Sequence, residues 1–508
     1  MNKILQKYKT EHVVIAFATL LNFIVHLIAG LNSGFHGDEL LHIEAGRHLA
    51  TGYMDFPPVI ALMAFFQNLW GSDSLFVNHL TVYLASAAIF ILSGLTTIRL
   101  GGGKIAVTTI MICLFFSPGI SASHALFLPV IFEQLAWVTC LLFLVSFCNR
   151  TEPKYIFGLA TAAAFGFLSK YSMAFLIAGV GISVLIFRRD VLKNKSLWLG
   201  ILLFAVLIFP NILWQINNGF PVFHHFSELY ETQLDKHSRF SELADLLLIL
   251  NPFVALFWIP AVFVTPFLPA FRKYRFVLFA LFTAFMLLFA AKGKSYYYFP
   301  VIMVALPAGA VFAEQLLSHR KWILTGLLTL TSVTGLLALP FGIPVLPLKT
   351  FISVYHLKPN EDGRYNIPFE NYYSKEIWNR ILTKVEANFN NLPLQDRQKC
   401  LVWGRHYSQA GGINLMGKNH NLPRAFSFHS SFYKWVPDFN KDAVIIVIAD
   451  PAWDLEHWQR FFNSVEEIST IENQYTQDKK WYFQRIFLCR DLKYNSTKLK
   501  EIFKNEIY

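Results

Sequence analysis

The chain has 508 residues, of which 54% are hydrophobic and only 15% charged. Soluble proteins carry about 25% charged residues, so the composition excludes an ordinary soluble enzyme and predicts a polytopic membrane protein. Lys and Arg outnumber Asp and Glu by 44 to 33. The excess lies in short segments between apolar blocks, which indicates membrane orientation and no nucleic-acid partner. The five cysteines show no paired spacing, so we expect no redox or cysteine-metal chemistry.

Apolar segments long enough to span a membrane run through the first two thirds of the chain. A span needs roughly 17–25 residues, and eleven segments approach or meet that length. The first lacks a cleavage site and is predicted to be a retained helix rather than a signal peptide. A shorter apolar stretch at 55–70 begins at a Pro-Pro pair and predicts a helix in the membrane interface. The eleven predicted helices lie near 12–32, 78–98, 105–121, 127–147, 154–169, 171–187, 197–214, 246–267, 276–292, 298–316 and 322–340.

A dense polar stretch follows the first apolar segment. Residues 34–58 read GFHGDELLHIEAGRHLATGYMDFPP and contain five acidic or basic residues and three histidines. So much charge between membrane segments usually marks a site, although an ordinary solvated loop is the alternative. Residues 33–77 are therefore the predicted catalytic loop.

Basic clusters predict the orientation of the chain. Clusters such as Arg188-Arg189 and 272–275 recur at every second predicted crossing. Under the positive-inside rule they lie in the cytoplasm. The catalytic loop and everything after about Phe341 then lie on the opposite side, which in a bacterial cell is the periplasmic side of the inner membrane.

The last third of the chain has a different pattern. Strand-like runs at 400–403, 443–449 and 481–489 alternate with helical patterns around 406–416 and 454–463. Such alternation predicts a small α/β domain. We therefore expect a transmembrane domain at 1–342 and an extracytoplasmic α/β domain at 343–508.

The order of residues in the loop resembles a known enzyme family. An Asp38-Glu39 pair at a helix exit is followed by Tyr53-x-Asp55-Phe-Pro-Pro. The same order is found in the first external loop of membrane glycosyltransferases of the protein O-mannosyltransferase type, which have the GT-C fold. The resemblance implies a polyprenyl-phosphate-linked sugar donor, a neighbouring membrane lipid, and a lipid, glycan or protein acceptor.

Sugar transfer from a phosphate-linked donor requires a base that removes the acceptor's proton. A carboxylate is suitable, and the polyprenyl phosphate leaves without an acid. In the resembling family the first acidic residue of the pair is the base, which implies catalytic roles for Asp38 and for Glu39 beside it. The alternative is that Asp38 only caps the helix that follows. Tyr53 and Asp55 are expected to contact the substrate.

A divalent metal is a further expectation. In the related aminoarabinose transferases of lipid A, the pattern is Glu-Lys-Pro-Pro and its acid is linked to metal binding. Here Asp55 replaces Glu and Phe56 replaces Lys. His224 and His225 lie after another family-like motif, and they are candidates to complete a Zn²⁺ or Mn²⁺ site with Asp55. The alternative is that these histidines are polar surface residues.

Basic residues on the predicted outer side are candidates for phosphate binding. Lys292 and Lys294 precede a run of three tyrosines that includes Tyr297, and Lys170 interrupts two apolar segments. A lipid-linked phosphate is a natural partner for such cations, and snorkelling to lipid headgroups is the alternative. A Lys-x-Tyr-Tyr pattern occurs at this place in the resembling family.

Two other functions share some of these features. A flippase for lipid-linked sugars would favour internal repeats and sites near the bilayer midplane, and the sequence shows neither. A polysaccharide polymerase or ligase would share the topology and the lipid-linked substrates. In the tail, residues 403–411 (WGRHYSQAG) lie at a predicted strand-to-helix turn, where a packing role is favoured over catalysis.

Overall fold

The computed structural model describes residues 9–232, 234–236, 238–479 and 481–504. The chain forms two compact units. The helical unit comprises Met1–Ile28, Phe56–Ile60 and Leu80–Val345. The loop–tail unit comprises Ala29–Asp55, Ala61–His79 and Leu346–Tyr508, so the polar loop belongs to the same unit as the C-terminal third.

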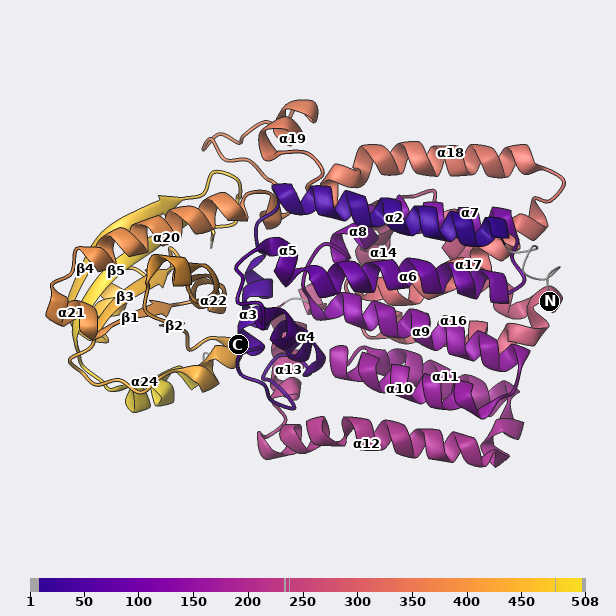
Figure 1. The fold of residues 1–508 in the computed structure, drawn as a ribbon, viewed down its shortest axis with the longest axis horizontal. Coiled ribbons are helices and arrows are strands. Elements are labelled where there is room, and N and C mark those ends of the chain that lie inside the picture. Colours follow the sequence, from indigo (N-terminus) through magenta and orange to yellow (C-terminus); the bar gives the residue numbers. More distant parts are fainter. Residues whose placement is uncertain (1–8, 233, 237, 480, 505–508) are drawn as a thin grey trace. The chain divides into compact units, whose positions relative to one another are not determined.

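The helical unit consists of helices, most of which are apolar and lie side by side (Figure 1). In chain order they are α2 (Lys9–Asn32, which continues into the loop–tail unit), α6 (Leu80–Arg99), α7 (Lys104–Phe115), α8 (Pro118–Ser123), α9 (Pro129–Asn149), α10 (Pro153–Ser169), α11 (Met173–Phe187), α12 (Lys195–Asn217), α13 (Pro221–Thr232), α14 (Arg239–Ile249), α15 (Ala255–Phe263), α16 (Arg275–Ala290), α17 (Phe299–Leu316) and α18 (Lys321–Ala338).

Within the described residues, seven helices are long and apolar enough to cross a membrane, so the protein is a multi-pass membrane protein. The segment predicted at 154–169 forms α10 over its full length, whereas the segments predicted at 105–121, 171–187 and 246–267 form shorter helices. The last of these is interrupted at Asn251, whose φ is 76°. Its side-chain amide donates to the carbonyl oxygens of Thr331 (2.9 Å) and Phe116 (3.1 Å), and a proline follows, so one continuous helix cannot form.

The loop–tail unit combines short helices with one mixed sheet. Its helices are α3 (Gly37–Ala45), α4 (Val59–Asn68, whose first two residues belong to the helical unit), α5 (Leu75–Asn78), α19 (Leu348–Val354), α20 (Ser374–Asn390), α21 (Leu394–Gln398), α22 (Tyr407–Met416), α23 (Leu455–Gln459) and α24 (Ser496–Phe503). Its strands are β1 (Cys400–Gly404), β2 (Ala425–Phe426), β3 (Val444–Ala449), β4 (Phe462–Glu472) and β5 (Phe483–Leu492).

The sheet has the strand order β2-β1-β3-β5-β4. Strand β1 pairs in parallel with β2 and β3, whereas β5 pairs antiparallel with both β3 and β4. Helix α22 therefore starts just beyond the carboxyl end of a parallel strand, where α/β sheets commonly place ligand-binding residues.

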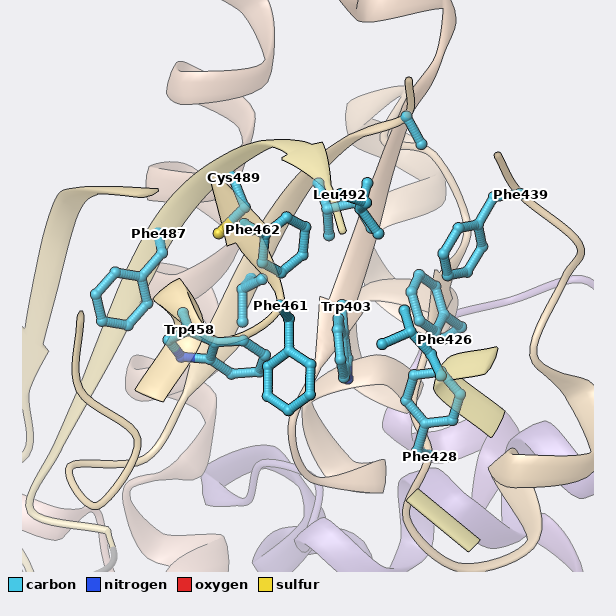
Figure 2. Close-up of a cluster of buried hydrophobic side chains, with 14 of the residues drawn as sticks. Trp403, Phe426, Phe428, Phe439, Trp458, Phe461, Phe462, Phe487, Cys489 and Leu492 are labelled. Atoms are coloured by element: carbon cyan, nitrogen blue, oxygen red, sulfur yellow. The ribbon is translucent and has the colours of Figure 1, made fainter. Parts of the chain in front are cut away.

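An aromatic core fills one face of this sheet (Figure 2). Trp403 and Trp458 are fully buried, with ring centroids 4.9 Å apart in an edge-to-face arrangement. Phe426, Phe428 and Phe462 pack around them. Because large aromatic side chains contribute much buried apolar area, this cluster fixes β1 and hence the start of α22.

Helix α22 packs closely against α3. The approach depends on Gly411, because a Cβ atom there would lie only 2.7 Å from the backbone oxygen of Leu40. This contact brings a helix of the polar loop against a helix of the C-terminal third.

Candidate active site

A capping box defines the start of α3. The N-cap is His36, whose Nδ1 accepts a hydrogen bond from the backbone N–H of Asp38 at 3.2 Å. Glu39 Oε2 in turn accepts from the His36 N–H at 2.7 Å. His36 therefore caps the helix, and the alternative cap role considered for Asp38 does not apply. The Asp38 carboxylate is left available for other contacts.

Tyr407 holds the Asp38 carboxylate. The tyrosine Oη donates to Asp38 Oδ1 at 2.5 Å, and the two residues are 369 positions apart in the chain. Burial and the neighbouring charge of Asp38 raise the pKa of Tyr407 well above its ordinary value, so the phenol stays a donor. The Asp38 side chain is 47% exposed, so it is oriented from one side and open on another.

A second carboxylate stands beside this pair. Glu370 accepts a hydrogen bond from the backbone N–H of Gly37 and lies 4.0 Å from His36 Nδ1. Burial raises the pKa of Glu370 despite the nearby histidine. Burial alone would lower the pKa of His36, but the charges of Glu370, Asp38 and Glu39 outweigh it and raise that pKa. The cluster therefore retains protons more readily than isolated side chains would.

Asp38 and Glu370 line a cavity of about 320 Å³ within the loop–tail unit. Its wall contains carboxylates, histidines, amides and aromatic rings, a mixture that suits a polar, hydroxyl-bearing ligand. The lining residues are His36, Gly37, Asp38, Glu370, Tyr373, Ser374, Ile377, Trp378, His406, Tyr407, Ser408, Asn473, Trp481 and Gln484.

Glu39 lies in a different environment from Asp38. It is fully buried, and its Oε1 lies 2.8 Å from Nε2 of His79, which is 2% exposed. Its other oxygen closes the capping box. Glu39 therefore fixes the start of α3, and a direct part in catalysis stays a prediction.

The other two loop candidates make contacts within the loop–tail unit. Asp55 Oδ2 accepts hydrogen bonds from the hydroxyls of Ser430 and Ser431, the latter at 3.2 Å. The Tyr53 hydroxyl donates to the carbonyl oxygen of His48 (3.0 Å) and accepts from the N–H of Ala50 (3.0 Å). Burial raises the pKa of Tyr53 to about 12. Substrate contacts of Tyr53 and Asp55 stay predictions.

The helical unit contains a separate cationic cluster. Lys170 Nζ lies 4.4 Å from the ring centroid of Tyr297 and 5.1 Å from that of Tyr296. It also interacts electrostatically with Glu133, a buried residue of α9, and with Lys294. Three of the predicted phosphate-binding residues therefore lie together, since Lys170, Lys294 and Tyr297 belong to this cluster.

Lys292 is arranged differently from the other lysines. Its ammonium group lies 2.6 Å from Oδ1 of Asp235 and 5.5 Å from the ring centroid of Tyr230. An ion pair already satisfies this cation, so its predicted phosphate contact would have to compete with Asp235.

The predicted metal ligands do not form a recognisable centre. In the described part of the chain, no three His, Cys, Asp or Glu side chains are grouped so as to hold a metal ion. His224 is exposed and His225 half-buried on α13. A Zn²⁺ or Mn²⁺ site that includes Asp55, His224 and His225 stays a prediction, and no chemical step below depends on it.

Two residues of the site were missed at the sequence level. Tyr407 lies in the 403–411 stretch, for which a packing role was favoured, although a polar strand-to-helix turn was a usable signal. Glu370 begins a short 3₁₀ helix (Glu370–Tyr372) in a stretch that carries no motif, so only the fold reveals it. Both residues come from the C-terminal third and face the start of α3.

Comparison with known proteins identifies the fold. Residues 55–214 match the family described as dolichyl-phosphate-mannose-protein mannosyltransferase. No curated protein matches the chain in sequence. The structure is similar to ArnT from Cupriavidus metallidurans bound to undecaprenyl phosphate, with a TM-score of 0.59, 12% identity and coverage of 93% of this chain and 97% of that chain. The apo state of the same protein is similar too, with a TM-score of 0.57, 14% identity and coverage of 93% of this chain and 98% of that chain.

A further similar structure is the archaeal oligosaccharyltransferase AglB from Archaeoglobus fulgidus, in complex with an inhibitory peptide and a dolichol-phosphate. The TM-score is 0.52 at 12% identity, and the match covers 82% of this chain and 64% of that chain. The match to ArnT extends over nearly the whole of both chains. The chain thus has the GT-C fold with a small C-terminal sheet domain, and the fold prediction is confirmed.

Proposed function

We propose that the protein is a membrane glycosyltransferase that moves a sugar from a polyprenyl-phosphate donor to a lipid, glycan or protein acceptor. The observation that carries the proposal is the Asp38 carboxylate, which is open to a polar cavity and oriented by Tyr407. The GT-C fold supports the same activity, since the similar ArnT structure contains undecaprenyl phosphate. The sugar that it moves is a hexose or a pentose.

The reaction is a single inverting displacement. Asp38 takes the proton of an acceptor hydroxyl as its oxygen forms a bond to the anomeric carbon of the sugar. The bond between that carbon and the phosphate oxygen breaks, and its electron pair leaves with the polyprenyl phosphate. One base is enough for this step, because the leaving group needs no proton. Tyr407 and Glu39 act as positioning residues for Asp38.

The cationic cluster of the helical unit is the proposed phosphate site. Lys170 and Lys294 supply positive charge, and Tyr297 supplies an aromatic face and a hydroxyl. Charge-assisted contacts from lysine to phosphate are among the stronger hydrogen bonds in proteins. We assign Lys292 a smaller part, because Asp235 already neutralises it.

The cell compartment follows from the basic loops. Under the positive-inside rule the cytoplasmic side carries clusters such as Arg188-Arg189, so the loop–tail unit belongs outside the cytoplasm. We therefore propose an inner-membrane enzyme whose chemistry takes place on the outer, periplasmic side. The lipid-linked donor would have to be supplied there by a separate translocation step.

Asp38→Asn tests the proposal. The amide keeps the size of the side chain but cannot accept the proton, so kcat should fall by at least about 10²-fold while donor binding is nearly unchanged. Asp442→Asn is the matched control, because it removes an exposed carboxylate of the same unit. Transfer is measured from a radiolabelled polyprenyl-phosphate sugar with purified full-length protein.

The outcome separates the proposal from its rivals. Near-normal turnover in Asp38→Asn would place the base elsewhere, with Asp55 and Glu370 as the next candidates. If none of these three substitutions slows transfer, the transferase assignment is wrong. A flippase would then be the leading alternative, and a polymerase or ligase would be recognised by growth of a glycan chain in the same assay.

A further inference from the structure

Helices α3 and α22 run in the same direction along one another. At their starts Tyr407 contacts Asp38, and near their ends the carbonyl oxygen of Asn414 accepts a hydrogen bond from Arg47 Nη1 at 3.2 Å. The helix pair therefore has two distinct ends. The acidic cavity described above lies at the starting end.

A second cavity, of about 330 Å³, lies at the other end of the helix pair. Three of its seven lining residues are cationic, and the remainder are mostly apolar. The lining residues are Arg47, Ile413, Asn414, Lys418, Leu422, Pro423 and Arg424.

A single buried carboxylate partly balances these cations. Glu44 is 3% exposed, with Oε2 2.5 Å from Arg47 and Oε1 2.8 Å from Arg424. Burial alone would raise the pKa of Glu44, but the hydrogen bond with His48 and the charges of the two arginines outweigh it and lower that pKa. Glu44 is thus a shared counter-ion for two arginines.

Lys418 is the third cation of the cavity, and it takes no part in the ion pairs of Glu44. It is exposed, and none of the ion pairs among the described residues includes it. The pKa of Lys418 is lowered, chiefly by repulsion from Arg47, and Arg424 adds to the repulsion. Glu44 and the exposed Asp73 offset that repulsion only in part. Arg47, Arg424 and Lys418 therefore carry more positive charge than the buried Glu44 and the exposed Asp73 balance.

We propose that this second cavity binds an anion of the phosphate type, held by Arg47, Lys418 and Arg424. Two guanidinium groups and one ammonium group match the oxygens of a phosphate monoester or diester. The apolar residues of the wall would accept the hydrocarbon portion of the same ligand. The alternative is a solvated basic surface, to which phosphate binding would not saturate.

The position of the cavity suggests two sources for the anion. Asp38 lies at the start of α3 and Arg47 just beyond its end, and the nine residues of α3 span ~13 Å. An acceptor whose hydroxyl reaches Asp38 can therefore place an anionic group at this cavity, an assignment that rests on the proposed function. The other source is the headgroup of an anionic phospholipid.

The first test measures phosphate binding directly. Inorganic phosphate is titrated into the full-length protein in a maltoside detergent, and ³¹P line broadening gives the Kd. The double variant Lys418→Gln/Arg424→Gln should raise that Kd by about tenfold or more, since each lost charge-assisted contact is worth a factor of that order. The control double variant Lys384→Gln/Lys441→Gln removes two exposed lysines of the same unit and should bind as the wild type does.

The single variant Lys418→Gln controls for misfolding of the double variant, because it leaves both ion pairs of Glu44 in place. It should weaken phosphate binding without changing the thermal midpoint. Equal phosphate affinity in wild type, Lys418→Gln and the double variant would overturn the proposal. Non-saturable broadening in the wild type would also overturn it, in favour of a solvated basic surface.

Two arms distinguish the sources of the anion. If the source is lipid, nanodiscs of phosphatidylglycerol should displace the phosphate, whereas those of phosphatidylcholine should not. If the source is the acceptor, Lys418→Gln should raise the acceptor KM at unchanged kcat. Phosphate titration of Asp38→Asn separates the two proposals, because the anion cavity should bind normally there even if the transferase assignment fails.

Discussion

Among the described residues, Tyr407 is the one tyrosine whose hydroxyl donates a hydrogen bond to Asp38, the proposed base. Tyr407→Phe keeps the ring and removes only the donor. A hydrogen bond to a charged group contributes about 1.5–3 kcal/mol, so kcat should fall roughly tenfold or more while the donor KM stays near its original value. Steady-state kinetics with a polyprenyl-phosphate sugar measures both constants.

The matched control for this change is Tyr433→Phe. Tyr433 is in the same unit, and its hydroxyl donates to the backbone oxygen of Lys500 at 2.8 Å. If both variants lose the same activity, Tyr407 is only a packing residue.

His42 makes the stability of the loop–tail unit depend on pH. It is 7% exposed on α3, and burial lowers its pKa to about 4 from an ordinary 6.5. Between those pH values the unfolded chain binds a proton that the folded chain does not, so stability falls as the pH falls through this window. The loss should be on the order of 3 kcal/mol.

His42→Gln should flatten the decline in thermal midpoint between pH 6.5 and pH 4. His319→Gln, at an exposed position, is the control and should leave the decline unchanged. An identical slope in wild type and His42→Gln would show that other groups account for the acid sensitivity.

At the scale of single residues, the sequence indicated only part of the candidate site. Asp38 was recognisable because charge is rare beside membrane helices and because the order of residues matches a family pattern. The same signals nominated Asp55, whose contact with substrate stays a prediction. Glu370 and Tyr407 were not assigned, since contacts between residues hundreds of positions apart leave no local signal. The polarity of 403–411 was visible, but a turn residue and a site residue look alike without the fold.

Helices α3 and α22 form the element on which the site is built. Gly411→Ala would place a methyl group 2.7 Å from the Leu40 oxygen, so the two helices would have to move apart. Overpacking of this kind costs typically about 1–3 kcal/mol. We expect a lower thermal midpoint and a lower kcat, because Tyr407 would be displaced from Asp38.

Gly326→Ala is a suitable control for this change. It lies within α18 and has no neighbouring atom within 4 Å of the added Cβ, so it should be neutral or slightly stabilising. A Gly411→Ala variant with wild-type stability and activity would show that the helix pair tolerates separation.

Most elements were predictable from periodicity, and the errors have local causes. Strands β1 and β3 were found within a few residues because they are continuous apolar runs, and β5 was found from the apolar residues at its centre (486–489). The pattern at 454–463 predicted one helix, but α23 ends at Gln459 and β4 begins at Phe462. Strand β4 is mostly polar, with only two of its residues buried, so its pairing with β5 determines its conformation.

The whole molecule should be oriented with its loop–tail unit outside the cytoplasm. A reporter fused after Arg189 should give a cytoplasmic signal, and one fused at Asn360 should give an external signal. The physical reason is the one-sided distribution of Lys and Arg in short loops. A fusion at the C-terminus is a second external probe, and a cytoplasmic signal from both probes would reverse the proposed orientation.

The loop–tail unit combines segments that are synthesised early and late, so it cannot assemble until the C-terminal third has been translated. Asp38 leaves the ribosome 369 residues before Tyr407. At about 5–20 residues per second, the interval is ~20–70 s. Throughout that time the nascent chain exposes α3 without its partner helix. A chaperone or the translocation machinery would have to protect α3 until translation is nearly complete. A protein truncated before α22 would lack the contact between Tyr407 and Asp38.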